Sequence, residues 1–509
     1  MWTLDYIGLY AQYAAVGLVY GSTGISYNFC VYYYEGATNL CANANNIILL
    51  AWSFKIVVAI FTDSYRPFGL RRRPYMLAGW SLVFLILLIL ACVADTLSAN
   101  TWLAYLVVSQ VFLMIADVPA DGYCVELGKM EPPETRGQIL ATGQRIRFTF
   151  SIFAGFLQTF LVNGPSTNKE DCEISWSECW SWGLSVGGYY GLLSAFVFIL
   201  TVPMYFLKEP DASKIPKHTV KEFIAKLWDT LQNLTTFYVL IYIIGIHAFA
   251  NFTSNAALLL QYYVIGLTNF QSGIDTMTSY VAIVAGVVTF QKFLINKNWR
   301  FTSYLSTIVT SLLSLLWLLA FHDIAGLRNG WYTIFVDMDQ SFTQGLSQVL
   351  YSMAVIELAH TGLEATTYEL MVSVGNASLT VAGILGTQLL WPVNANGCEE
   401  DDCPSNSVDV TSEEAFEASD GPARFTHYQV LLMGISIVAN IIFTQFLPTQ
   451  KDQCEEWKKK GEEMGQSTLR GYVTLTMCVV VVSYGILASV LLLDTDTSCL
   501  KVFGGAGCD

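Results

Sequence analysis

The chain has 509 residues and a formal net charge of -15, and 53% of its residues are hydrophobic while only 13% are charged. Soluble globular proteins carry roughly twice that share of charged residues, so the composition excludes this class and predicts a surface covered by lipid. The acidic residues gather in a few short stretches, and no basic patch suited to nucleic acid is visible in the sequence.

Apolar stretches long enough to span a membrane recur along the whole chain. A spanning helix needs about 20 mostly apolar residues, because in hydrocarbon each backbone group must find its partner within the segment. We therefore expect an all-α integral membrane protein with thirteen helices. The predicted spans are residues 7–30, 46–62, 75–95, 102–124, 138–162, 187–207, 236–258, 275–295, 301–321, 340–360, 366–391, 427–447 and 471–493.

Lysine and arginine residues divide unequally between the two sides of these spans. If the N-terminus is cytoplasmic, nineteen of them fall in inner loops and four in outer loops. Cytoplasmic loops carry an excess of these residues, so we expect this orientation. The thirteenth span exceeds the twelve that are usual in carriers, and it would leave the C-terminus outside.

Eight of the twelve cysteines fall in predicted outer loops or at an outer helix end. Their close spacing predicts disulfides formed in an oxidising space, and unpaired loop thiols are the alternative. These cysteines are Cys30, Cys41, Cys172, Cys179, Cys398, Cys403, Cys499 and Cys508.

A basic stretch divides the spans into two sets of six. We expect an N-terminal half at residues 1–207, a cytoplasmic linker at 208–235 and a C-terminal half at 236–447. Residues 448–509 would hold a cytoplasmic loop, the extra helix and an outer tail with cysteines. Val-Glu-Leu at 125–127 has a counterpart, Ile-Glu-Leu, at 356–358. A parallel repeat is the architecture of carriers whose halves rock about a central site.

The loop between the second and third spans places an acid at a helix end before a basic cluster. A carboxylate there can bind arginines in one conformation and release them in another. Alternatively, the arginines only anchor the loop inside, and two of the acids, Glu364 and Glu369, are stabilised by a helix N-terminus. We predict a conformational latch. Its members are Asp63, Arg71, Arg72, Arg73, Glu126, Arg136, Glu364 and Glu369.

Three stretches together resemble the folate-biopterin transporters of the major facilitator superfamily. They are the loop at 63–74, the D-x-x-x-D pair of Asp117 and Asp121 with the following V-E and R-G, and the G-x-E-A-T segment at 362–366. The resemblance runs from about residue 10 to 447. It implies a major-facilitator bundle of two six-helix halves and transport of folates or pterins by alternating access.

Ionisable groups inside a membrane are costly, so they usually face a cavity or each other. A carboxylate can accept the adjacent N–H groups of a pterin ring, and an arginine suits the carboxylates of folate. Two arginines that are two positions apart in one helix point to opposite sides, so at most one of them serves a cavity. The predicted substrate-binding or coupling residues are Lys55, Asp117, Asp121, Arg145, Arg147, His247 and Asn251.

Structural alternatives exist for each of these residues. We expect Asp121 to pair with Arg145, and Asp117 to face a cavity rather than to neutralise Arg147. Lys55 either pairs with Asp117 or extends toward water. His247 and Asn251 lie on one helix face, where they line the cavity of the second half or form hydrogen bonds between helices.

The sequence therefore predicts a secondary carrier of folate, biopterin or a related small anion, with a proton as one option for the coupling ion. No phosphate-binding loop and no metal-binding spacing is visible, so we expect neither an ATP-driven pump nor an enzyme, and no cofactor. A carrier of another small metabolite and a non-transporting receptor or scaffold are the alternatives. We expect a monomer in the lipid bilayer, without nucleic acid, in the plasma membrane by default or else in an internal membrane.

Overall fold

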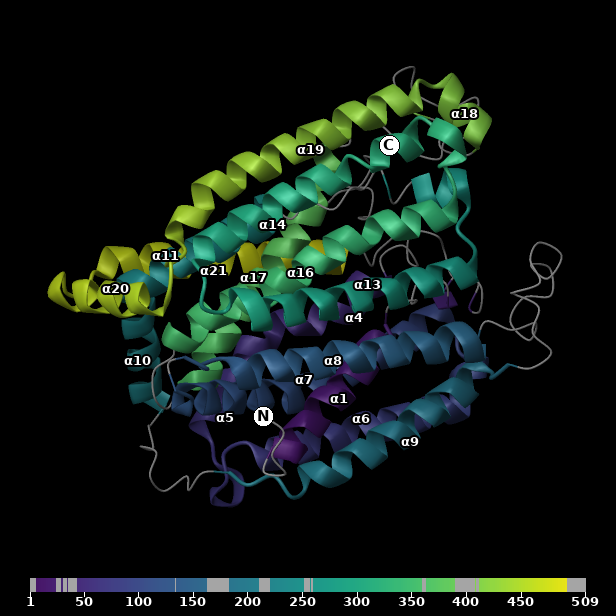
Figure 1. Cartoon of the computed structure of the whole chain (residues 1–509). Helices are drawn as coiled ribbons and strands as arrows, with labels where there is room; N and C mark the ends of the chain where they lie inside the picture. Colours follow the sequence, from purple (N-terminus) through teal and green to yellow (C-terminus); the bar gives the residue numbers. More distant parts are fainter. Residues whose placement is uncertain are drawn as a thin grey trace.

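Long helices dominate the chain because hydrocarbon leaves backbone groups no partner outside their own helix. The computed structural model describes residues 6–23, 29–30, 34, 44–132, 134–162, 183–209, 220–250, 257, 260–358, 363–389, 408 and 412–491. Within these ranges all regular structure is helical. Most of the long helices lie side by side in one bundle (Figure 1).

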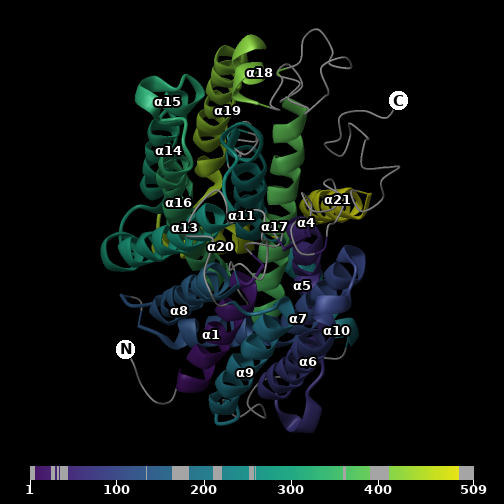
Figure 2. The ribbon, with the colours of Figure 1, turned by 90° about the vertical axis from the view of Figure 1, so that its right-hand side faces the viewer.

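The helices of the first 207 residues form one side of the bundle (Figure 2). α1 packs on α8 and α9, and α6 packs on α7 and α9. Gly17 allows the first of these contacts, because a Cβ there would lie 1.9 Å from the backbone oxygen of Arg147. The elements are α1 (Ile7–Gly21), α4 (Ala44–Leu49), η3 (Leu50–Phe54), α5 (Lys55–Ser64), η4 (Pro67–Gly69), α6 (Arg73–Val93), η5 (Ala94–Thr96), α7 (Ala99–Met130), α8 (Gln138–Leu157), η6 (Gln158–Val162) and α9 (Val186–Met204).

The helices after residue 233 form the other side. α16 packs on α13 and α14, and α19 packs on α14 and η10. The elements are α11 (Leu234–Gly245), η10 (Ile246–Ala250), η11 (Leu260–Ile265), α13 (Asn269–Thr289), η12 (Phe290–Leu294), α14 (Trp299–Ser314), α15 (Trp317–Phe321), η13 (Ile324–Gly326), α16 (Gly330–Leu358), α17 (Glu364–Leu389), α19 (Gly421–Phe443) and η14 (Thr444–Phe446).

Two further helices lie at the end of the bundle that carries Arg71–Arg73, which we call the basic end. They are α10 (Val220–Gln232) and α20 (Lys451–Glu463), at the left of Figure 1. The short helix α18 (Glu413–Ala418) lies at the opposite end, and the last helix, α21 (Thr468–Leu491), packs against α10 and α17.

The structure is that of an all-helical, multi-pass membrane protein. Eight helices of the described ranges are long and apolar enough to cross a membrane, or nine if the bent pair 224–232 and 234–249 is one span. Each of the thirteen predicted windows overlaps a helix, and α21 is among the eight. The full count of thirteen spans stays a prediction, because helices such as α1, α8 and α16 do not meet the criterion of length and hydropathy.

The two sides of the bundle have separate cores as well as a shared one. One cluster of buried residues contains only residues 11–204, and another contains only residues 257–432. A third cluster joins the sides where α8 meets α13 and where α5 and α7 meet α17. This arrangement favours the predicted division into two halves, which stays a prediction.

The predicted disulfides fall mostly on residues that the structure does not describe. Of the eight cysteines expected in outer loops, Cys30 alone lies within the described ranges. The four cysteines expected elsewhere, Cys92, Cys124, Cys454 and Cys478, are free thiols. The pairing of the outer cysteines stays a prediction.

Candidate functional site

The second predicted span is broken, and the break exposes helix ends inside the bundle. α4 ends at Leu49, the 3-10 segment η3 follows, and α5 begins at Lys55. Broken helices are tolerated at membrane depth where neighbouring groups satisfy the freed backbone. Here the amide N–H of Ile56 donates to the hydroxyl of Ser373 in α17, at 3.2 Å. The break therefore places Lys55 against both α7 and α17.

The Lys55 ammonium is at the centre of a buried cluster of charges. Its Nζ lies 2.7 Å from Asp117 Oδ2, 3.0 Å from Asp121 Oδ2 and 3.4 Å from Glu369 Oε1. None of the four side chains is more than 3% exposed. The Tyr13 hydroxyl of α1 donates to Asp121 Oδ1 at 2.8 Å. We call Lys55, Asp117, Asp121 and Glu369 the buried charge cluster.

Arg147 borders this cluster within a group of aromatic rings. Its guanidinium lies 4.8 Å from the ring centre of Trp52 and 5.3 Å from that of Tyr20, and it interacts electrostatically with Asp117. Lys55 also lies over Trp52, at 5.1 Å. Cations over aromatic faces gain energy from the ring quadrupole, most of all where water is excluded. The rings and the charges together make a partly aromatic, strongly polar centre of the bundle.

The two arginines of α8 point to different sides, as their spacing predicts. Arg147 is buried, whereas Arg145 is half-buried and donates to Gln291 in η12, directly after α13. The expected pairing of Asp121 with Arg145 is wrong, because Asp121 binds Lys55 and Tyr13 instead. The two carboxylates of α7 share the one ammonium of Lys55.

The predicted residues of the second half are only partly described. His247 Nδ1 lies 2.8 Å from the carbonyl oxygen of Ile243, one turn earlier, and its ring contacts that of Tyr351 edge to face. This hydrogen bond stays within one helix, so the two alternatives for His247, a cavity-lining residue and a hydrogen bond between helices, both stay predictions. Asn251 lies outside the described residues.

A second set of charges lies at the other end of α5, nearer to the basic end of the bundle. Asp63 Oδ1 is 2.9 Å from Arg71 Nη2 and 2.8 Å from Arg72 Nη2, and Glu126 Oε1 is 2.7 Å from Arg71 and 2.6 Å from Arg72. Arg71 also lies 3.0 Å from Glu364 Oε2 of α17. We call these five residues the gate, since Arg71 joins the two sides of the bundle.

Further bonds across the same end strengthen the connection. The backbone N–H and the hydroxyl of Thr366 both donate to Asp63 Oδ2, at 2.9 and 2.8 Å. Arg136 binds both oxygens of Glu357 at 3.0 Å. Gly122 lets α7 and α17 approach, because a Cβ there would lie 2.6 Å from the Cβ of Ala365. These bonds join the two sides of the bundle at its basic end.

Two residues of the predicted latch are placed elsewhere. Arg73 stacks on Tyr205, with its guanidinium carbon 4.8 Å from the ring centre. Glu369 lies in the buried charge cluster rather than in the gate, because α17 carries it one and a half turns beyond Glu364. The sequence predicts that both side chains belong to the latch, but neither contacts the five gate residues in this way.

The helix α20 ties the second half to the gate region from outside the spans. The ammonium of Lys451 donates to the backbone oxygen of Arg136 at 3.3 Å, and that of Lys458 donates to the backbone oxygen of Glu357. Burial raises the pKa of the Cys454 thiol in this helix to about 12, and the nearby charge of Glu357 adds to the effect. α20 thus covers the ends of α16 and α8.

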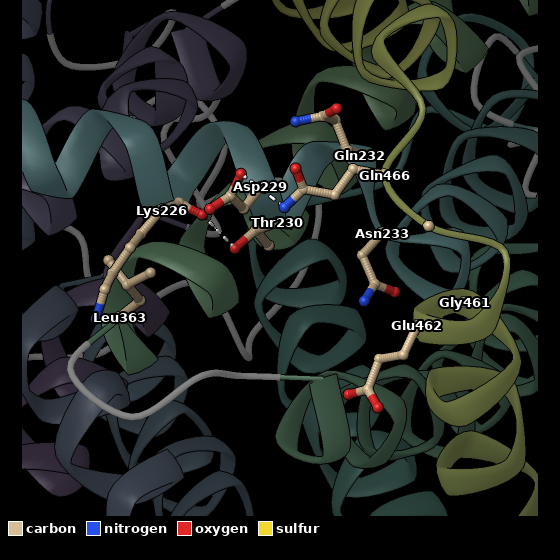
Figure 3. Close-up of a pocket in the computed structure, with 10 residues that line it drawn as sticks. Lys226, Asp229, Thr230, Gln232, Asn233, Leu363, Gly461, Glu462 and Gln466 are labelled. Atoms are coloured by element: carbon tan, nitrogen blue, oxygen red, sulfur yellow. Dashed lines mark hydrogen bonds between the residues drawn. The ribbon is translucent and has the colours of Figure 1, made fainter.

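A pocket of about 530 Å³ opens at the basic end between α10, α20 and the start of α17 (Figure 3). Its lining includes the ammonium-bearing Lys226 and the carboxylates of Asp229 and Glu462. The side-chain amide of Gln466 already donates to Asp229 at 3.0 Å. With more acidic than basic groups, this pocket does not suit an anionic substrate. The buried charge cluster is the better candidate site.

Some of the residues at the site were missed by sequence reasoning. Tyr13, Tyr20 and Trp52 contact its charges, and Glu209 accepts the backbone N–H groups of Arg71 and Arg72 at 2.8 and 2.9 Å. Glu209 also accepts from the backbone of Arg73. The position of Glu209, an acidic residue just after the sixth predicted span, could have indicated that it binds the basic loop. The aromatic residues gave none, because tyrosines and tryptophans occur throughout this sequence.

Metal binding is not indicated in the part of the chain that the structure describes. No group of three or more histidine, cysteine or acidic side chains there has a geometry that could hold a metal ion. The acids of the buried charge cluster are directed at lysine, tyrosine and each other.

Comparison with known protein families matches residues 23–467 to the BT1 family. A curated protein from Synechocystis sp., a folate-biopterin transporter, is 22% identical over 352 residues, which are 66% of this chain and 64% of that protein. The match thus spans just under two thirds of that relative's length.

Among solved structures, the chain is similar to the proton:xylose symporter XylE of the major facilitator superfamily, bound to 6-bromo-6-deoxy-D-glucose. The TM-score is 0.55 with 10% sequence identity, over 89% of this chain and 99% of that one. At this identity the similarity concerns the fold alone, which is that of the major facilitator superfamily.

Proposed function

The chain belongs to the BT1 family of membrane transporters, and we propose that it carries folate, biopterin or a related small anion by alternating access. The observation that supports this proposal is the buried charge cluster beside Arg147 and its aromatic rings, where the two sides of the bundle meet. In carriers of this architecture the substrate site lies near the midplane between the halves.

The chemistry of the site suits the proposed substrates. A pterin is a flat ring with adjacent N–H donors, which a carboxylate such as Asp117 can accept, and aromatic faces such as Trp52 can stack on the ring. Arg147 offers the planar fork that binds carboxylates in two parallel bonds. Both Asp117 oxygens lack a hydrogen-bond partner of acceptable geometry among the described residues, although Lys55 is close. This leaves acceptor capacity for a ligand.

We also propose the organisation that alternating access requires. Residues 1–207 and 236–447 act as two six-helix halves, and 208–235 links them on the cytoplasmic side. The gate then closes the cytoplasmic side in the state described, with α20 docked over it. α21 is proposed as a thirteenth span. A monomer is the proposed functional unit, with the plasma membrane as its default location.

The test is uptake of radiolabelled folate and of biopterin into proteoliposomes that contain the full chain. We expect saturable uptake, and we expect Asp117→Asn and Arg147→Ala each to reduce it at least tenfold, because each variant removes a charge that faces the substrate. Glu414→Gln removes an exposed charge of α18 and should transport normally. Melting temperatures of the purified variants verify that they fold.

Absence of uptake of both compounds by the folded wild type would contradict the proposed substrates. A survey of other small anions would then separate a carrier of another metabolite from a receptor, since a receptor binds its ligand without any translocation.

A further inference from the structure

Glu369 has surroundings that the transport proposal does not use. It lies in α17, its side chain is fully buried, and Oε1 accepts from Lys55 at 3.4 Å. Its second oxygen, Oε2, has no hydrogen-bond partner within the described part of the chain. A buried carboxylate oxygen without a donor is unusual, because an ionised carboxylate normally accepts several hydrogen bonds.

The charges around Glu369 do not balance. Among the described residues, three carboxyl groups, those of Asp117, Asp121 and Glu369, face two cations, Lys55 and Arg147. If all five groups were ionised, one negative charge would be buried without compensation, which is strongly unfavourable in the interior of a membrane protein. One carboxyl group of this site is therefore expected to hold a proton.

The contacts indicate which carboxyl group this is. Asp117 has the shortest contact to Lys55 and also faces Arg147, and Asp121 has both Lys55 and the Tyr13 hydroxyl. Glu369 has the longest of the three contacts to the ammonium. Its carboxyl group contacts the same ammonium as that of Asp121, and two carboxyl groups held so close together disfavour the ionisation of both.

The described residues of α16 and η10 that face this cluster add no further charge to balance Glu369. From α16, the phenol of Tyr351 faces the same charges, as does that of Tyr368 in α17 itself. From η10, the His247 ring binds the carbonyl of Ile243 and contacts Tyr351. Lys55 from α5, the two aspartates of α7 and Arg147 from α8 complete the set.

We propose that Glu369 is the proton-carrying group that couples transport to a proton gradient. The inference rests on the proposed transport function. Glu369 belongs to the second side of the bundle, whereas Lys55, Asp117 and Asp121 belong to the first. When α17 separates from α5 and α7, Glu369 meets water on the cytoplasmic side, its O–H bond breaks, and the proton passes to that water. On the return to the other state the carboxylate binds a proton from the outer side.

The experiment uses proteoliposomes that hold the full chain and a trapped pH-sensitive dye. Folate or biopterin is added outside, and lumenal acidification is recorded together with uptake of the labelled compound. For the wild type we expect protons to enter with substrate, and an inward proton gradient to raise the initial uptake rate several-fold. For Glu369→Gln, which is permanently neutral, we expect at least a tenfold loss of proton entry per substrate and no response to the gradient, while exchange of labelled for unlabelled substrate continues.

Glu414→Gln serves as the matched control and should behave as the wild type does. Glu369→Asp keeps a titratable group, so proton entry should be retained at a shifted external pH, which separates loss of the proton from damage to the fold. Wild-type uptake without proton entry would overturn the inference and leave the transport function in place. Undiminished proton entry in Glu369→Gln would also overturn it. No uptake by the wild type would remove the proposed function, and the coupling role with it.

Discussion

The Lys55 side chain contacts acidic groups from two sides of the bundle at once. Its ammonium contacts Asp117 and Asp121 in α7 and Glu369 in α17, all of them buried. A single cation shared in this way contributes more than one ordinary pair, because its removal leaves several acids without compensation. The loss of stability when Lys55 is replaced therefore measures its contribution to the folded state.

We expect Lys55→Met to destabilise the protein by roughly 3–5 kcal/mol, the cost of leaving a buried charge unpaired. The thermal unfolding temperature in detergent measures the effect. Lys459→Met changes an exposed lysine of α20 and should leave that temperature unchanged. Adding Asp117→Asn to Lys55→Met should restore part of the loss, because the unpaired charge is then smaller. An unaltered unfolding temperature in Lys55→Met would show that the acids are neutral without the lysine.

Which charges lie together could be predicted from the sequence only in part. Residues on one helix have a fixed angular relation, so the spacing predicted that Arg145 and Arg147 point to different sides, but not which of them is buried. The pairing of Asp121 could not be predicted, since contacts between helices depend on how each helix is rotated, and the break before Lys55 has no clear sequence signal. Tyr13 and Tyr20 were missed for the same reason.

At the scale of helices, the position of α20 should depend on whether the gate is formed. It contacts the backbone of Arg136 and of Glu357, one on each side of the bundle, through Lys451 and Lys458. A helix that binds both sides must lose at least one of these contacts when the sides separate. Its buried Cys454 provides a natural probe for that movement.

We expect Cys454 to react slowly with N-ethylmaleimide at neutral pH, because the reactive species is the thiolate and burial raises the thiol pKa to about 12. Arg71→Ala weakens the gate and should accelerate this alkylation at least tenfold, as α20 undocks and the thiol meets water. Peptide mapping by mass spectrometry measures the modification, with the denatured protein as the reference for full reactivity. Equal rates in wild type and variant would mean that α20 does not move with the gate.

At the scale of the whole molecule, most of the helix positions could be predicted, because hydrocarbon imposes a length and a hydropathy on every span. The interruptions could not. Residues 46–62 form three consecutive helical segments rather than one regular α-helix, and polar helices such as α16 do not meet the hydropathy criterion for a span. A helix that is surrounded mainly by protein can have a lower mean hydropathy than a helix that faces lipid.

The odd number of proposed spans has a simple consequence for topology. We expect an epitope tag at the N-terminus to be reached by antibody only after cells are permeabilised, and one at the C-terminus to be reached in intact cells. The nineteen to four division of lysine and arginine residues is the reason for this orientation. Two tags on the same side would show that α21 does not cross the membrane.

The length of α7 has a consequence for the membrane around the protein. Its 32 residues extend about 48 Å at 1.5 Å per residue, well beyond the roughly 30 Å of hydrocarbon in a bilayer. The gate residue Glu126 lies in the last turns of this helix, so the gate stands at the level of the lipid headgroups. Anionic headgroups there attract arginines and compete with Glu126 and Asp63 once the gate loosens. We therefore expect phosphatidylserine in the inner leaflet to favour the open gate and phosphatidylcholine to favour the closed one.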